Sequence, residues 1–567
     1  MKKELRNIRL ILPILHIVAS FLYERCILIF RADIDVVAAI PLNNAISDRA
    51  EQIIAYAVAK LFAMLAVFAL WKLVFYVKDH WKTDGGVRLF VLLFAAGGLL
   101  LSLQWPDGFL RSEDNLITYS YAIRLWPEYW HSAYSSIVYC ACLMVLPHPF
   151  SVSLLQWLAA VLVIAYLYER IRTSPVLKGR GKWLAFGILL IPDSYYLLTD
   201  AYRTSHYALL SAFFVTLAVM DIIDRRERSG RELAGMVLLC GFLSVWRTEG
   251  IVLGILGFGV LIVFGYRYSL KKCLLLLAGV AAAFLVINLP QKLGSEKYYG
   301  NDYSFINSFP TLQNVLNAPS ANLGYEGATE DLTALGQVTP VEVIQAYGME
   351  GYRRQNVRNG YRDINQSGAD AETGAAYKKA YYRMILHNLP IYVRTQGSML
   401  LQAIRLKEYC YIEKSAVSVT MEPWHYDAWD IGREDLFAAP GVKAWYELPL
   451  RRTLAEGWRT ARTAVSDFLR RAYLQSLILI LAGLLEAVLF CRETILFFRK
   501  KSACLGMAGM AFVLLGQAAA IVLVMPAGVL AYFHAYFYCT AVLDILYLLY
   551  LRSSKTKQVF PDGERKD

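Results

Sequence analysis

The fold of this chain is decided by the stretch W-P-D-G-F-L-R-S-E-D-N-L-I-T-Y-S-Y-A-I-R, which runs from Trp105 to Arg124. It follows an apolar run at about 88–104 and carries the adjacent acids Glu113 and Asp114. The acids fall where a membrane helix would leave the bilayer, a depth at which charge is costly unless it has a partner or a task. We therefore expect this loop to hold a functional site that the surrounding helices position.

The composition indicates a polytopic membrane protein. Hydrophobic residues make up 57% of the 567 positions. Apolar runs of roughly 17–25 residues recur, a length that crosses about 30 Å of hydrocarbon. The first run, at about 8–30, lacks a small-residue cleavage site and is interrupted by Tyr23-Glu24-Arg25, so we interpret it as a retained helix and not a signal peptide.

The net charge of +12 does not predict a nucleic-acid partner. Lysine and arginine cluster in short loops between the apolar runs, as expected for cytoplasmic loops of a membrane protein. No CxxC motif or His/Cys cluster predicts a zinc site.

Run length and loop charge together predict an all-α protein with about twelve transmembrane helices and both termini in the cytoplasm. The basic run at 169–182 belongs inside, so the short apolar piece at 133–147 is expected to lie at the interface or re-enter. The expected spans are about 8–30, 53–77, 88–104, 151–169, 183–199, 205–223, 233–246, 250–266, 273–289, 477–497, 504–525 and 529–551.

Four regions follow from this topology. They are two N-terminal helices (1–87), a membrane core with an outer loop at 105–150 (88–290), an extracytoplasmic segment (291–474), and C-terminal helices with a cytoplasmic tail (475–567). Within the extracytoplasmic segment, 368–387 has a helical pattern, and 388–406 is expected to form an amphipathic surface helix because Arg394 and Gln396 argue against a span.

Ionisable residues from separate helix ends converge on the predicted outer face. Each has an ordinary structural alternative: a helix cap for Asp200, a structural ion pair for Arg247 with Glu249, and an interfacial aromatic belt for His131. The candidates are Asp114, Glu113, Asp200, Arg247, Glu249, His131 and Arg203.

The chemistry of these groups is suited to the transfer of a group from a lipid phosphate to an acceptor hydroxyl. A carboxylate acts as general base on an acceptor hydroxyl, and an arginine binds a phosphate through paired hydrogen bonds. A divalent cation such as Mg²⁺ or Mn²⁺, held by the carboxylates, is a further way to neutralise a leaving phosphate.

The region at about 88–290 resembles the GT-C superfamily of membrane glycosyltransferases, such as the aminoarabinose transferases and protein mannosyltransferases. The resemblance rests on Glu113-Asp114 followed by Tyr119, on Asp200 at the next outer turn, and on the turn Arg247-Thr248-Glu249-Gly250. It implies that Asp114 is the catalytic aspartate and that Tyr119 lies at the substrate site. The family's lysine-proline-proline motif is absent here, and 291–474 matches no known pattern.

The sequence therefore predicts a glycosyltransferase of the plasma membrane. It would transfer a sugar from a polyprenyl-phosphate donor to a glycan, lipid or protein acceptor on the outer face. One rival is a surface-polysaccharide polymerase or ligase that depends on Arg353, Arg354 and Arg358. The other is a lipid or solute transporter, which should carry mid-membrane charges; the candidate charges sit at helix ends, which argues against it.

Overall fold

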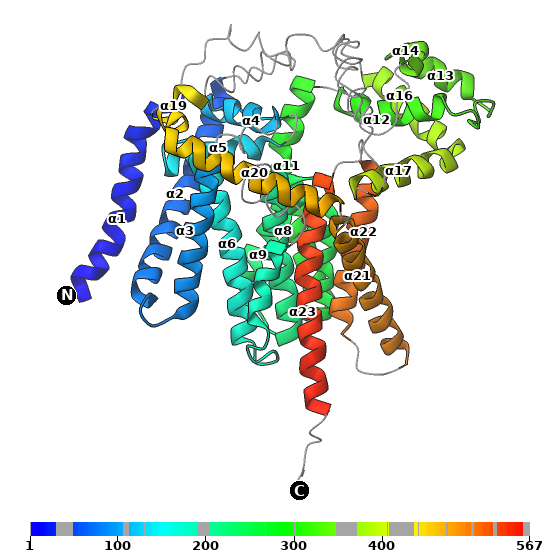
Figure 1. Cartoon of the computed structure of the whole chain (residues 1–567). Coiled ribbons are helices and arrows are strands. Elements are labelled where there is room, and N and C mark those ends of the chain that lie inside the picture. Colours follow the sequence, from blue (N-terminus) through cyan, green and yellow to red (C-terminus); the bar gives the residue numbers. More distant parts are fainter. Residues whose placement is uncertain are drawn as a thin grey trace.

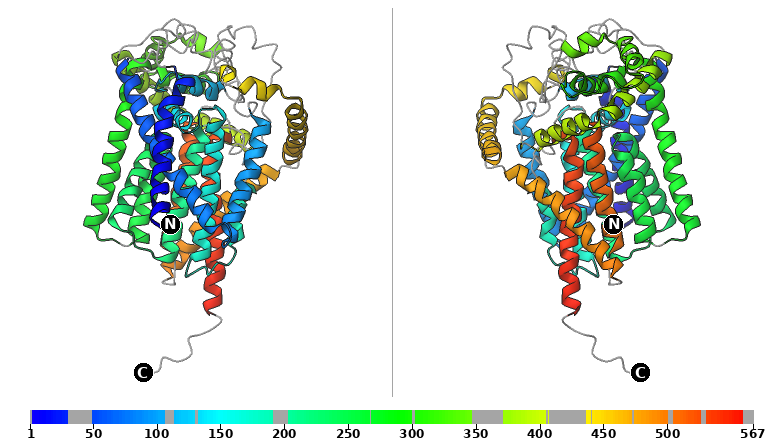
Figure 2. Two further views of the ribbon diagram at one scale, coloured as in Figure 1. Left: turned by 90° about the vertical axis from the view of Figure 1, so that its left-hand side faces the viewer. Right: turned by 90° about the vertical axis from the view of Figure 1, so that its right-hand side faces the viewer.

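The computed structural model is helical throughout its described part and contains no strand there (Figure 1). The structure describes residues 2–29, 49–105, 113–129, 132–190, 203–266, 268–299, 302–346, 371–404, 406, 436–439, 441–471, 474–499, 504–525 and 530–558. Long helices stand side by side in a bundle, and a group of shorter helices lies at the end opposite the last residues of α23 (Figures 1 and 2). A membrane protein made of helices satisfies its backbone polar groups within each element.

The N-terminal quarter of the chain packs around its own apolar cluster. Its helices, listed in order, are α1 (Lys2–Tyr23), η1 (Glu24–Cys26), α2 (Arg49–His80), α3 (Gly85–Gln104), α4 (Glu113–Ile123) and α5 (Ala133–Val145). The buried residues of α1, α2, α4 and α5 form this cluster, with Leu143 and Leu116 fully enclosed.

The central helices form the main core. They are α6 (Phe150–Thr173), η4 (Lys182–Leu190), α8 (Arg203–Asp224), α9 (Gly230–Trp246), η5 (Val252–Gly257), α10 (Phe258–Val260), η6 (Leu261–Gly265) and α11 (Leu270–Tyr299). Helix α8 is buried on nearly every side, because α6, α9, α22 and α23 all pack against it. A helix that is apolar all round belongs at the centre of a bundle.

The remaining helices form the shorter group and the C-terminal part of the bundle. They are α12 (Asp302–Leu316), α13 (Ala328–Gly336), α14 (Val341–Ala346), α16 (Ala371–His387), α17 (Leu389–Ala403), α19 (Val442–Glu447), α20 (Pro449–Arg471), α21 (Leu474–Phe498), α22 (Leu505–Val524), η7 (Leu530–Phe533) and α23 (His534–Gln558). The group α12–α16 has its own small core, which includes Phe305, Leu335 and Tyr377. The predicted helices at 368–387 and 388–406 correspond to α16 and α17 and are confirmed as helices.

Seven described helices are long and apolar enough to cross a membrane. They are Arg49–His80, Gly85–Gln104, Phe150–Thr173, Arg203–Asp224, Leu270–Lys297, Leu505–Val524 and Leu530–Ser553. The count of twelve spans is not confirmed. The expected span at 183–199 begins as the nine-residue 3₁₀ helix η4 and continues into residues outside the described part, and the one at 250–266 is a short helix with two π-helical turns.

Two helices run across the bundle and not along it (Figure 1). In α17, Tyr392 and Gln396 donate hydrogen bonds to the carbonyl oxygen of Leu523, at the end of α22. In α20, Arg451 donates to the carbonyl oxygens of Leu103 and Trp105, at the end of α3. The last carbonyls of a helix lack partners within it, so each transverse helix supplies donors to the end of a helix that is long and apolar enough to span a membrane.

Candidate functional site

The turn between α9 and η5 carries a buried arginine, Arg247. Helix α9 ends at Trp246, and Arg247 has an extended backbone as its C-cap. The amide of Gly250 donates to the carbonyl oxygen of Arg247 at 2.9 Å. A Cβ at position 250 would lie 2.0 Å from the carbonyl oxygen of Leu243, so only glycine fits this close approach.

Arg247 is held from two sides. Its Nε is paired with the carboxylate of Glu249, and its Nη1 donates to the hydroxyl of Thr204 at 2.8 Å. The side chains of Arg247 and Glu249 are only 9% and 5% exposed. Among the described residues, Nη2 of Arg247 makes no hydrogen bond, although a guanidinium presents five N–H groups. One edge of a desolvated cation therefore faces away from its protein partners.

One aromatic ring packs on this ion pair, and three more pack together at the adjoining ends of α8 and α9. The guanidinium of Arg247 lies over the ring of Tyr532 at 5.6 Å. The ring of His206 stands edge-on to Trp246 and to Tyr139, with both centroid distances at 6.1 Å. The indole Nε1 of Trp246 donates to the carbonyl oxygen of Arg203 at 2.9 Å. Side chains from α5, α8, α9 and η7 thus meet at one end of the bundle.

The loop between α4 and α5 is fastened to α11. The side-chain oxygen of Gln291 accepts from the amide of Ala133 at 2.7 Å, and its nitrogen donates to the carbonyl of Tyr129 at 2.8 Å. The hydroxyl of Tyr134 donates to the carbonyl of Ile287 at 2.6 Å. These bonds fix both flanks of the segment that contains His131, which itself lies outside the described residues.

The predicted site residues divide into three groups. The structure brings Arg203, Arg247 and Glu249 together at the ends of α8 and α9. Tyr119 is fully buried in the separate apolar cluster of α1, α2, α4 and α5. The remaining predicted residues are not placed in full: Glu113 and Asp114 open α4 but their side chains are not described, and Asp200 and His131 lie outside the described part.

A buried ion pair between η1 and α2 was missed by sequence reasoning. The ammonium of Lys60 lies 2.6 Å from the carboxylate of Glu24, and the hydroxyl of Tyr56 donates to the same carboxylate at 2.6 Å. Both charged side chains are almost completely enclosed. The sequence signal was available, since Glu24 and Lys60 each fall inside an apolar run where an unpaired charge is costly.

A second buried network fastens the opposite end of the bundle. Asp221 of α8 is enclosed and accepts from Arg170 at 3.3 Å, Arg228 at 2.5 Å and the hydroxyl of Tyr266 at 2.6 Å. Arg170 also bonds to Asp224 at 3.2 Å. The network joins α6, α8 and η6. From the sequence, Arg170 was expected in the basic cytoplasmic run at 169–182, whereas Asp221 fell inside the expected span at 205–223.

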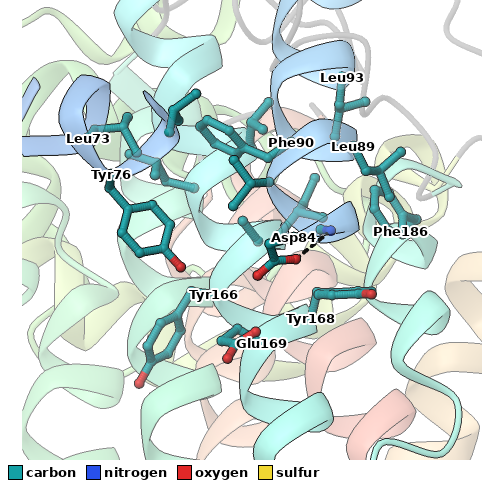
Figure 3. Close-up of a pocket in the computed structure, with 17 residues that line it drawn as sticks. Leu73, Tyr76, Asp84, Leu89, Phe90, Leu93, Tyr166, Tyr168, Glu169 and Phe186 are labelled. Atoms are coloured by element: carbon teal, nitrogen blue, oxygen red, sulfur yellow. Dashed lines mark hydrogen bonds between the residues drawn. The ribbon is translucent and has the colours of Figure 1, made fainter. Parts of the chain in front are cut away.

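A groove of about 290 Å³ lies between α2, α3 and α6, with Phe186 of η4 at its edge (Figure 3). Its wall is apolar except for a few polar groups, and these have structural tasks. Asp84 accepts from the amide of Gly86 at 2.7 Å as the cap of α3, and Glu169 is paired through both oxygens with Arg172. The groove contains none of the predicted site residues.

The structure and the comparisons add no cofactor or family. Within the described ranges, no three His, Cys, Asp or Glu side chains gather as they would around a metal ion. No family model, no curated protein and no solved structure matches the chain.

Proposed function

We propose that this chain is a GT-C-like integral-membrane glycosyltransferase with about twelve spans. It transfers a sugar from a polyprenyl-phosphate donor to a glycan, lipid or protein acceptor of the cell envelope, on the outer face of the plasma membrane. The single observation that carries the proposal is the buried guanidinium of Arg247, whose Nη2 edge is not used by any described residue.

That guanidinium suits a lipid phosphate. An arginine in a desolvated position binds phosphate through parallel N–H groups more strongly than it does in water. Glu249 and Thr204 orient the side chain through Nε and Nη1, which leaves Nη2 for an anion. The guanidinium lies over the ring of Tyr532 and its side chain is only 9% exposed, so little water reaches it.

The proposed reaction needs one base and one anion site. The acceptor hydroxyl attacks the anomeric carbon of the donor sugar, and the bond from that carbon to the phosphate oxygen breaks. The polyprenyl phosphate leaves with the electron pair and is stabilised by Arg247. The hydroxyl proton passes to the carboxylate of Asp114, as expected for general base catalysis. Asp200 would orient the acceptor.

The proposal is tested by transfer of a labelled sugar from polyprenyl phosphate in proteoliposomes. The wild type is compared with Asp114→Asn and with the matched control Asp84→Asn, whose asparagine still caps α3 at the far end of the bundle. We expect transfer by the wild type and the control and none by Asp114→Asn. Full activity of folded Asp114→Asn would remove Asp114 as the base, and no transfer by the wild type from any such donor would overturn the proposal.

The two alternative functions, a polymerase or ligase and a transporter, predict different experimental results. A polymerase or ligase would lose activity on substitution of Arg353, Arg354 or Arg358, which lie outside the described residues. A transporter was disfavoured because the candidate site charges were expected at helix ends. Glu486 was not among those candidates, and it lies at the midpoint of α21, completely enclosed. Transport of the unmodified lipid or solute is therefore the control assay for the same proteoliposomes.

A further inference from the structure

A carboxyl group lies buried halfway along α21. Glu486 is at the midpoint of Leu474–Phe498 and is fully enclosed. The hydroxyl of Tyr536 donates to its Oε2 at 2.8 Å, and the hydroxyl of Thr540 donates to the same oxygen at 3.3 Å. Both donors belong to α23, which is one of the seven helices able to span a membrane. Glu486 therefore faces a helix that is long and apolar enough to span a membrane.

A second carboxyl group follows on the same face of α23. Asp544 is one turn beyond Thr540, and residues four apart on a helix lie above one another. Its side chain is buried, with an exposed fraction of 7%. Its Oδ1 is enclosed and has no hydrogen-bond partner. Such an atom is a strong acceptor left without a donor, which is expensive in a low-dielectric interior.

The described surroundings supply no cation to this pair. The neighbouring arginine of α21, Arg492, is bound to Glu493 and to the hydroxyl of Tyr547 further along the helix. Helix α22 carries no charged residue between Leu505 and Val524. The other charged or titratable groups on α8 and η4, which pack against α23, contact other residues. Asp221 and Asp224 bond to Arg170, and Tyr207 bonds to Gln517. The ring of His206 packs against Tyr139 and Trp246, and Lys182 lies over Tyr168 and Trp183. Arg203 is the first residue of α8, where its carbonyl oxygen accepts from Trp246.

Two carboxylates buried in the interface of α21 and α23 without a cation cannot both remain ionised inside a membrane, because burial and like charge both disfavour the charged form. A proton removes both costs: it neutralises one group and provides the donor that the enclosed Asp544 oxygen lacks. We propose that Glu486 and Asp544 form a proton-binding site within the membrane, between α21 and α23. The bound species is a proton and not a metal ion, since among the described residues no third His, Cys, Asp or Glu side chain joins this pair as it would around a metal ion.

The proton site has a polar neighbour toward the end of α21. Glu493 accepts from the hydroxyl of Tyr547 at 2.6 Å and from the amide of Cys504 at 2.8 Å. Arg492 beside it is 44% exposed. Together, Tyr536, Thr540, Asp544 and Tyr547 form a polar stripe along α23 that faces α21. Release of the proton would leave a charge in this interface, so proton binding is linked to the packing of α21 against α23.

The test is infrared spectroscopy of the full chain in lipid nanodiscs. The carbonyl stretch of a protonated carboxylic acid is resolved from that of a carboxylate. We expect the wild type to keep a protonated-carboxyl band at neutral pH, and Glu486→Gln with Asp544→Asn to remove it. Glu232→Gln is the matched control, because Glu232 caps α9 at an exposed position and bonds to Ser229. A band that the double variant retains in full, or a wild type without one, would overturn the proposal.

A labelling experiment covers the case in which the double variant does not fold. The wild-type chain is made with carboxyl-labelled aspartate in one sample and carboxyl-labelled glutamate in another. We expect at least one label to shift the protonated-carboxyl band to lower frequency and the band to titrate only in alkaline buffer. A band that disappears on going from acidic to neutral pH, as for exposed carboxyls, contradicts the site.

Discussion

The guanidinium of Arg451 donates a hydrogen bond to the carbonyl oxygen of Trp105, a residue 346 positions earlier in the chain. This contact fixes the transverse helix α20 to the end of α3. Arg451 also bonds to Leu103 at 3.2 Å and lies over the ring of Tyr446 at 4.5 Å. A cation at a helix C-terminus interacts favourably with the unpaired carbonyls and the helix dipole.

Arg451→Gln is expected to loosen α20 from the bundle. The glutamine cannot reach both carbonyls, so they lose donors and the free energy of unfolding falls by about 1–3 kcal/mol. The measurement is the thermal unfolding temperature in detergent, together with the rate of proteolysis within α20. Arg452→Gln is the matched control, since Arg452 is exposed, and equal effects of the two substitutions would argue against the cap.

Arg247→Gln and Glu249→Gln separate stability from function at the candidate site. Either substitution alone leaves a buried charge unpaired, which costs roughly 3–5 kcal/mol. The double variant removes both charges, so we expect its stability to return to within about 1–2 kcal/mol of the wild type. Its sugar transfer should stay reduced by at least tenfold, because the phosphate partner is gone, and each tenfold corresponds to about 1.4 kcal/mol. Restored transfer in the double variant would show that the pair is purely structural.

Gly250→Ala is expected to disrupt the turn that carries Arg247. The new Cβ would overlap the carbonyl oxygen of Leu243, so the turn has to move. We expect a loss of roughly 1–3 kcal/mol, typical of forced overpacking. Gly235→Ala is the control, because nothing lies within 4 Å of its added Cβ and alanine is the better helix former. The measurement is the unfolding temperature of the two variants. An unchanged unfolding temperature for Gly250→Ala would contradict the close approach of position 250 to the carbonyl oxygen of Leu243.

His148 is expected to make the fold less stable in acid. Its ring packs against Trp105 at 5.4 Å and accepts from the amide of Phe150 at 3.1 Å, and burial lowers its pKa from the ordinary value. Because the unfolded chain then binds the proton more readily, stability is lost as pH falls through the unfolded pKa of about 6.5. The difference in unfolding temperature between about pH 7.5 and about pH 5.5 should shrink in His148→Gln. If the difference between the two unfolding temperatures is unchanged in this variant, His148 is not the cause of the loss of stability in acid.

The helical class and several elements were predictable from the sequence because their signals are local. Apolar runs gave α2, α3, α6, α8 and α22, and the amphipathic pattern gave α17. The span count was not recovered, since run length alone does not distinguish a spanning helix from the short, π-helical segment between Val252 and Gly265.

The transverse helix α20 escaped prediction for a related reason. Its six arginines made the segment look like part of an extramembrane domain. Its apolar residues nevertheless form one stripe at helical spacing, and its large exposed hydrophobic residues, among the described side chains, are Leu450, Leu454, Val465 and Phe468. A stripe of this kind with flanking arginines is typical of a helix that lies in the membrane interface.

The candidate site was predictable only in part. The turn at Arg247 carried a recognisable pattern, whereas the enclosure of Glu486 by Tyr536 and Thr540 depends on contacts between helices 50 and 54 residues apart. Pairings across that separation arise from packing and leave no local signal. The location of Tyr119 in another apolar cluster likewise followed from how α4 packs on α5.

The buried network around Asp221 has a consequence for how the bundle can move. It ties α6, α8 and η6 together at the end remote from Arg247, through three separate donors to one enclosed carboxylate. Breaking such a cluster is costly, so that end behaves as the fixed pivot of the central helices. We therefore expect any widening of the bundle to separate the opposite helix ends, where Arg203 and Arg247 lie.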